Sequence, residues 1–90
     1  MKNRVKHIIL MEYYLNKCNE LIKIKNPTYI QDEMLHYMIH HLSMYYSSKQ
    51  WIKDYDDYSL GLFPKDLRCG VLSQDAIYDL LDEYKNYKLN

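Results

Sequence analysis

The sequence predicts an all-α fold: a small helical bundle of three long helices plus one short helix, with an irregular Pro/Gly connector before the last helix. Three observations lead to this prediction. Only two glycines and two prolines occur among 90 residues, so the elements should be few and long. Apolar residues recur at spacings of three and four, and no segment shows the alternation of a strand. The length and a hydrophobic content of 48% predict a single domain, residues 1–90, with its own core.

The first helix is expected from about Asn3 to Lys25. Its apolar residues are spaced by three, four, three and four positions, which places them on one face of a helix. Asn26-Pro27 should end it, because a residue before proline avoids the α conformation. The seam consists of Ile8, Met11, Leu15, Cys18 and Ile22, and it is widened by Val5, Ile9 and Leu21.

A second helix should begin between Thr28 and Gln31 and end at Tyr45 or Tyr46. It repeats the seam spacing, with Leu35, Met38, Leu42 and Tyr45 on one face. The sequence Ser47-Ser-Lys-Gln50 then matches a capping box. It predicts a short third helix that bends away from the second and runs through Trp51, Ile52, Tyr55 and about as far as Tyr58.

Residues 58–72 are expected to form the connector. Pro64 and Gly70 exclude a continuous helix, although Lys65-Asp-Leu67 could form a single turn. Ser73 should cap a last helix from Gln74 to about Tyr87. Apolar connector residues should pack beneath the loop: Leu60, Leu62, Phe63, Leu67, Val71 and Leu72. The last helix carries a stripe of Ile77, Leu80, Leu81, Tyr84 and Tyr87.

Tyrosine dominates the aromatic residues, with 11 Tyr against one Phe and one Trp. A buried tyrosine needs a partner for its hydroxyl, so a domain of this size should leave several tyrosines half-exposed. One explanation is the codon bias of an AT-rich genome. The other is a tyrosine-rich binding face, because tyrosine is enriched at the centres of protein interfaces.

The net charge is zero but unevenly distributed. Residues 1–50 carry seven basic and four acidic side chains, and residues 51–90 carry five basic and eight acidic ones. A simple nucleic-acid-binding protein would have a larger basic excess. The basic residues of the first helix could touch phosphate, but we interpret them as a solvated face. Nucleic acid is therefore not expected as a direct ligand.

The chain is expected to lie in the cytoplasm, without a membrane contact. Its two cysteines are too few for a disulfide scaffold. Glu12 interrupts the apolar run that follows the basic N-terminal residues, and no small-residue cleavage site follows, so no signal peptide is expected. No apolar run has the length of a bilayer-spanning helix.

No recognised arrangement of nucleophile and base is present, so we expect no catalytic residue and no cofactor. Cys18 lies on the seam of the first helix and should be a core residue. Cys69 follows Arg68, which could lower the pKa of the thiol, but no histidine or acid is near it in sequence. We interpret it as non-catalytic.

Glu33, His36 and His40 are the candidate metal ligands. The Glu-x-x-His spacing of Glu33 and His36 occurs in di-iron bundles, and His36 with His40 could hold a zinc ion. Such sites need further ligands that the sequence does not supply. The alternative is an exposed polar stripe opposite the seam of the second helix.

An acidic and aromatic patch is the best candidate for binding a partner. Its aromatic residues would act as anchors and its aspartates as steering charges for a basic partner. The alternative is a solvated helix end with its aromatic rings turned inward. The patch comprises Trp51, Asp54, Tyr55, Asp56, Asp57 and Tyr58, and the charged loop residues Lys65, Asp66 and Arg68 complete the predicted partner-binding set.

Short motifs follow one another between residues 46 and 84. They are Trp51-x-x-Asp54 after a serine-containing break, Pro64-Lys-Asp-Leu67, Gly70-Val-Leu-Ser73 followed by Asp75, and Tyr78-x-Leu80-Leu81. In these motifs the chain resembles a family of short bacterial proteins catalogued as a domain of unknown function. It departs from that pattern at Phe63, Cys69 and Gln74. The resemblance implies a small helical cytoplasmic protein and supplies no activity and no catalytic residues.

These observations favour a non-catalytic helical protein that acts by binding another protein. A homodimer is a further expectation, formed through apolar seam residues of the first two helices that the core does not use. Two other functions stay open. One is a phage or mobile-element inhibitor of a host defence nuclease, in which acidic residues would occupy the nucleic-acid channel. The other is a metal-binding protein using Glu33, His36 and His40.

Overall fold

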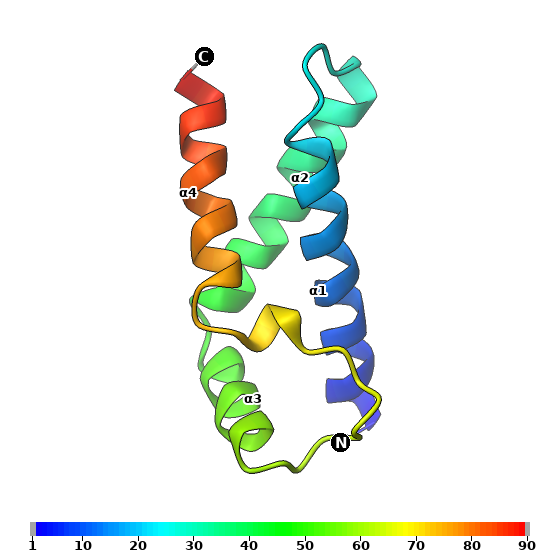
Figure 1. Ribbon diagram of the computed structural model, residues 1–90, viewed down its shortest axis with the longest axis vertical. Coiled ribbons are helices and arrows are strands. Elements are labelled where there is room, and N and C mark those ends of the chain that lie inside the picture. The colour runs from blue at the N-terminus through cyan, green and yellow to red at the C-terminus, as the bar shows by residue number, and fades with distance from the viewer. Residues whose placement is uncertain (1, 90) are drawn as a thin grey trace.

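The computed structural model describes residues 2–89, which form four α-helices and one 3-10 turn. These are α1 (Lys2–Leu21), α2 (Tyr29–Tyr46), α3 (Lys49–Ser59), η1 (Gly70–Leu72) and α4 (Ala76–Leu89). Helices α1, α2 and α4 follow the long axis of a molecule of 41 × 19 × 17 Å, and α3 lies across one end (Figure 1). No strand occurs within residues 2–89, so the all-α prediction is confirmed.

The predicted seams form the core. All five seam residues predicted for the first helix are buried, although Ile22 lies just beyond the end of α1, and so are all four of α2. Ile77 and Leu80 bring α4 onto them. Leu81, Tyr84 and Tyr87 are partly buried and pack against the same cluster. Ile9 differs from the prediction, because it is 55% exposed on the outer side of α1.

Helix α1 ends four residues before the predicted boundary. After Leu21 the chain tightens into short turns, in which the Lys23 amide donates to the Glu20 carbonyl and the Ile24 amide to the Leu21 carbonyl. Such bonds between residues three apart satisfy carbonyls at a helix end. Helix α2 starts with a capping box: Thr28 Oγ1 accepts from the Gln31 amide at 3.1 Å, and Gln31 Oε1 accepts from the Thr28 amide at 2.9 Å.

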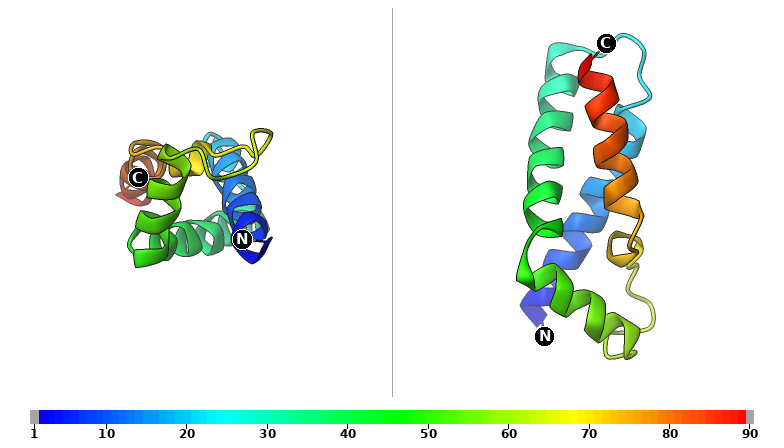
Figure 2. Two further views of the ribbon diagram at one scale, coloured as in Figure 1. Left: turned by 90° about the horizontal axis from the view of Figure 1, so that it is seen from below. Right: turned by 90° about the vertical axis from the view of Figure 1, so that its left-hand side faces the viewer.

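Helix α3 begins one residue later than the predicted box. Ser48, not Ser47, is its cap, and Ser48 Oγ accepts from the Trp51 amide at 3.2 Å. Ser47 still belongs to the last turn of α2, where its amide donates to the Ser43 carbonyl. The short break turns α3 away from α2, as predicted, and the three views show it crossing the end of the bundle (Figure 2).

The connector is partly as predicted. A turn closes between Pro64 and Leu67, and Ser73 Oγ caps the last helix by accepting from the Ala76 amide at 3.2 Å, two residues beyond the expected start. The turn η1 was not predicted. Phe63, Val71 and Leu72 are buried beneath the connector, but Leu60 and Leu62 are 71% and 55% exposed, so their predicted burial is wrong.

Over residues 2–89, every helix is too short or too polar to cross a lipid bilayer.

Candidate interaction surface

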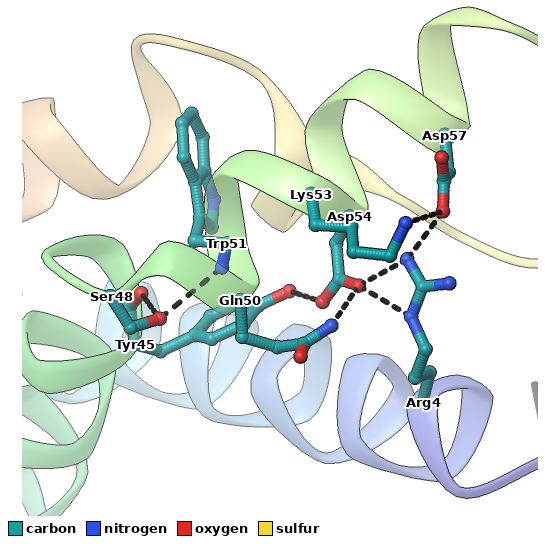
Figure 3. A network of polar contacts seen from close by, with 8 residues as sticks. All are labelled: Arg4, Tyr45, Ser48, Gln50, Trp51, Lys53, Asp54 and Asp57. Atoms are coloured by element: carbon teal, nitrogen blue, oxygen red, sulfur yellow. Dashed lines mark hydrogen bonds and ion pairs between the residues drawn. The ribbon is translucent and has the colours of Figure 1, made fainter.

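The Asp54 carboxylate is the centre of a buried polar network (Figure 3). Oδ1 accepts from Arg4 Nε at 2.9 Å, from Arg4 Nη2 at 2.7 Å and from Gln50 Nε2 at 2.8 Å. Oδ2 accepts from the Tyr45 hydroxyl at 2.5 Å. Asp54 is 1% exposed, so these four hydrogen bonds replace the water that the charge has lost. The network joins α1, α2 and α3.

Asp57 extends the network towards solvent. Its Oδ2 lies 2.8 Å from Arg4 Nη2 and 3.7 Å from Lys53 Nζ. The hydrogen bond from Arg4 lowers the pKa of Asp57, and the hydrogen bond to Asp54 raises the pKa of Arg4. Burial, followed by the bond to Asp54, raises the pKa of Tyr45. All three shifts favour the protonation states that hold the network together.

Two of the three aspartates predicted to steer a partner therefore make contacts within the molecule. Asp54 is enclosed, and Asp57 is committed to the Arg4 guanidinium, which also lies over the Phe63 ring at 5.1 Å. Their placement corrects the expectation that Asp54 and Asp57 present charge to a basic partner. Of the three aspartates, Asp56 is exposed.

Trp51 also makes its contacts within the molecule. Its Nε1 donates to the Val71 carbonyl at 3.1 Å, which ties α3 to η1. Its ring stacks on Tyr55 with centroids 5.4 Å apart and meets the edge of Tyr46 at 5.0 Å. The Tyr55 hydroxyl accepts from Gln74 Nε2 at 3.2 Å. These contacts hold two of the three predicted anchors, Trp51 and Tyr55, in half-buried positions.

A second polar contact joins α1 to the connector. Glu12 Oε1 accepts from the Val71 amide at 2.8 Å. A Cβ atom at Gly70 would lie 3.0 Å from Glu12 Oε2, so glycine leaves room for this carboxylate. Burial raises the pKa of Cys69, and the nearby Glu12 raises it further. The thiol is therefore held protonated, contrary to the lowering that Arg68 could have caused.

The histidine stripe of α2 is exposed, as the alternative interpretation expected. His36 Nδ1 lies 2.5 Å from the Tyr84 hydroxyl of α4. Within the described residues, no group of three or more His, Cys, Asp or Glu side chains could hold a metal ion. Glu33 and His36 both border a hollow of about 640 Å³ between α4 and the start of α2, whereas His40 does not.

The charged loop lies apart from the α3 patch. Lys65, Asp66 and Arg68 are exposed. Asp66 and Arg68 border a groove of about 460 Å³ between the connector and α1, whose apolar side chains include Val5, Ile9 and Leu67. The structure thus divides the predicted partner-binding set between an interior network, the outer side of α3 and this groove.

The end of α3 carries exposed apolar residues that the sequence did not indicate. Gly61 adopts φ +71°, the Leu62 amide donates to the Asp57 carbonyl and the Gly61 amide donates to the Tyr58 carbonyl. This pattern is a Schellman motif, which fixes the backbone at a helix end. We call the α3 surface the exposed set Ile52, Asp56, Tyr58, Leu60 and Leu62.

A second exposed apolar area lies on the outer side of α1 and α2. The Tyr14 ring lies 6.3 Å from the rings of both Tyr13 and Tyr37, and Tyr37 lies 4.5 Å from His41. A shallow hollow of about 470 Å³ continues along this area. It is lined by Tyr14, Tyr29, Ile30, Glu33, Met34, Tyr37 and Met38. The prediction of half-exposed tyrosines holds, and several of them cluster here.

Comparison with known proteins identifies one family. The model described as Domain of unknown function (DUF4298) matches residues 8–89, a wider range than the motifs of residues 46–84. No curated protein and no solved structure matches the chain. Within the matched range, Trp51 and Asp54 have structural roles, since one holds η1 and the other anchors the Arg4 network.

Proposed function

The chain belongs to the family of the domain of unknown function DUF4298, and we propose that it is a non-catalytic protein that binds another protein through the α3 surface. The observation that carries this proposal is the exposure of Leu60 and Leu62, at 71% and 55%, on a turn with a fixed backbone. Apolar side chains grouped in water are a feature of interaction sites.

The neighbours of this turn support the proposal. Ile52, near the start of α3, is 56% exposed, and Tyr58, near its end, is 47% exposed, so two further large side chains of α3 are accessible to a partner. The Schellman motif holds the turn before a partner arrives, which reduces the conformational entropy that binding must remove. Tyr58 adds the side-chain type most often found among the residues that dominate binding energies.

The charges favour an apolar partner site over a basic one. Arg4 compensates Asp54 and Asp57, which leaves Asp56 as the acidic member of the α3 surface. We therefore propose that the partner offers an apolar pocket or groove for Leu60 and Leu62, with polar groups at its rim. In this arrangement Asp56 contributes orientation more than affinity.

The absence of catalysis is part of the proposal, and pKa directions support it. Burial raises the pKa of Cys69, and burial raises that of Tyr84, whereas an activated nucleophile needs a lowered value. Cys18 is fully buried, and its pKa is raised to about 12.

Affinity capture from a lysate of the native host tests the proposal. The wild-type chain is compared with the double variant Leu60→Ser/Leu62→Ser, and Tyr78→Ser, a 59% exposed residue on α4, is the matched control. We expect wild type and control to capture the same stoichiometric protein. The double variant should bind it at least about 100-fold more weakly, because each buried leucine contributes about 1.5–3 kcal/mol.

Two results would count against the proposal. If the double variant keeps the partner while retaining its helical circular dichroism, the α3 surface is not the binding site. If no stoichiometric protein accompanies wild type, the interaction function itself is contradicted.

A further inference from the structure

Helix α2 carries a second seam on the side away from the core. Ile30, Met34, Tyr37, His41 and Met44 follow one another at spacings of four, three, four and three. This is the repeat of a helix face that packs along another helix. Four of these residues are nevertheless exposed: Ile30 by 69%, Met34 by 40%, Tyr37 by 58% and Met44 by 59%.

Helix α1 extends the same apolar face. Tyr14 joins the two helices through its ring contacts with Tyr37 and His41. Beside it on α1 lie Leu10, which is 43% exposed, and Tyr13, which is 56% exposed. The α1–α2 face is defined as this second, outer seam of α2 together with Leu10, Tyr13 and Tyr14.

The spacing indicates what can cover this face. Side chains at alternating intervals of three and four form a nearly straight row, which a helix running almost parallel or antiparallel to α2 fills over several turns. Ile30 and Met44 are 14 residues apart, so the row is about 21 Å long at 1.5 Å per residue. A long helical element therefore fits it.

We propose that a second copy of this chain covers the α1–α2 face, in a two-fold symmetric antiparallel dimer. The ends of the seam are symmetric about Tyr37, because Ile30 and Met44 lie seven residues to either side of it, and Met34 and His41 lie three and four residues from it. A two-fold axis at Tyr37 pairs Tyr37 with its own equivalent, and Ile30 of one copy with Met44 of the other. Self-pairing of one patch is the usual geometry of a dimer interface.

The polar residues beside the seam support the antiparallel direction, because a histidine ring can donate a hydrogen bond to a carboxylate. Glu33 and His40 flank the seam on the same side, one before its centre and one after it. Antiparallel pairing brings Glu33 of one copy opposite His40 of the other, at both ends of the interface. In a parallel pair the two-fold axis would run along the helices and would put Glu33 and His40 of one copy on the opposite edge of the interface from those of the other, so this contact would be absent.

The exposed area is comparable to that of a small dimer interface. Interfaces of standard size take about 800 Å² from each partner. The face offers Ile30, Met34, Tyr37, Met44, Leu10 and Tyr13, each 40–69% exposed. A wholly buried aromatic side chain contributes about 150–250 Å², and Tyr37 and Tyr13 are each a little over half exposed, so the six residues approach the standard area when their polar neighbours on α1 and α2 are included. The same symmetry places the two α1 helices along the same edge of the α2 pair. Leu10 and Tyr13 of one copy therefore also face α1 of the second copy.

Sedimentation velocity across a range of concentrations tests the dimer. Wild type should form a dimer at micromolar concentration, and Tyr37→Arg should be monomeric under the same conditions, because it places two guanidinium groups at the symmetry axis. Tyr78→Arg, on an exposed residue of α4, should leave the dimer intact. Tyr37 is exposed, so circular dichroism should show the helices of Tyr37→Arg unchanged.

Cross-linking tests the register independently of stability. In a Cys69→Ser background, Tyr37→Cys should form an intermolecular disulfide on mild oxidation, and Tyr78→Cys should not. Cys18 is buried and does not compete. A wild-type chain that is monomeric at 100-fold higher concentration, a Tyr37→Arg variant that remains dimeric, or equal cross-linking at residues 37 and 78 would each overturn the proposal. The variant Leu60→Ser/Leu62→Ser should still dimerise, so this test and the capture experiment fail separately.

Discussion

Two polar networks at opposite ends of the bundle use similar side chains in different surroundings. At the end crossed by α3, Asp54 accepts bonds from Arg4, Tyr45 and Gln50 while it is 1% exposed. At the other end, where α4 finishes beside the start of α2, the exposed Asp32 accepts from the Tyr87 hydroxyl at 2.8 Å (Figure 1). Both networks join helices that are distant in sequence.

The difference lies in what each group loses when its bond is broken. A group at the Asp32 end regains water, so its hydrogen bond contributes little to the free energy of unfolding. A group in the Asp54 network is left buried without a partner, which costs far more than the bond itself. Burial, more than bond length, therefore determines how much each of these contacts contributes to the free energy of unfolding, and four measurements test this difference.

The largest effect is expected from Asp54→Asn. The amide keeps the size of the side chain but removes the charge that Arg4 and Tyr45 hold. Breaking a buried ion pair by removing one partner costs about 3–5 kcal/mol, and we expect about 3 kcal/mol here because Arg4 keeps Asp57. Urea unfolding followed by circular dichroism measures the change. A loss below about 1 kcal/mol would contradict the special role of burial.

Gly70→Ala should have the next largest effect, about 1–2 kcal/mol, because its Cβ would crowd the Glu12 carboxylate at 3.0 Å. To isolate the effect of this steric contact, Gly70→Ala is also introduced into Glu12→Ala, which lacks the carboxylate. In the Glu12→Ala background, the added methyl group should cost nothing further. A double-mutant cycle by urea unfolding checks this, and additive costs in the two backgrounds would show that Gly70 is needed for another reason.

The acid dependence of stability should reflect Asp57. Its pKa is lower in the folded chain than the ordinary value of about 3.9, chiefly through Arg4. A lowered folded pKa gives stability that is fully present above the unfolded value and is lost as the pH falls through the folded one. Asp57→Asn should therefore flatten the fall in stability below about pH 4. Equal slopes for wild type and variant, in urea titrations at successive pH values, would exclude this contribution.

The smallest effect is expected from Tyr87→Phe at the exposed end. Removing the hydroxyl leaves Asp32 open to water, and the stacked rings of Tyr84 and Tyr87, 5.8 Å apart, are kept. We expect a change in the free energy of unfolding of about 0.5 kcal/mol or less. A matched variant at the buried end, Tyr45→Phe, should cost several times more. Equal changes in the free energy of unfolding for Tyr87→Phe and Tyr45→Phe would show that burial does not distinguish the two ends of the bundle.

The helices were predictable because their signals are local. Apolar residues three and four apart identified the seams of α1 and α2, and Pro27 and Ser73 indicated where one helix had ended and another was to begin. Helix ends were less accurate where neighbouring residues could share a role. Ser47 and Ser48 both suit a cap, and the geometry of the bend selected Ser48.

The site was less predictable because its contacts join residues far apart in sequence. Nothing near Asp54 indicates that Arg4, 50 positions away, will pair with it, so an interior charge looked like a surface charge. Leu60 and Leu62 are apolar and were expected inside, yet the Schellman motif around Gly61 turns them outward. The exposed seam of α2 was present in the sequence, but the inner seam beside it gave the stronger helical signal.

The bond between Glu12 and the Val71 amide also bears on how the chain is made. It spans 59 positions, and the Arg4–Asp54 pair spans 50. During synthesis α1 is translated before the other helices. The partners of its Glu12 carboxylate and its Arg4 guanidinium, the Val71 amide and Asp54, are translated much later. The early helices can form as they appear, whereas the contacts that fix α1 need most of the chain. We therefore expect the domain to complete its folding only after α3 and η1 have emerged from the ribosome.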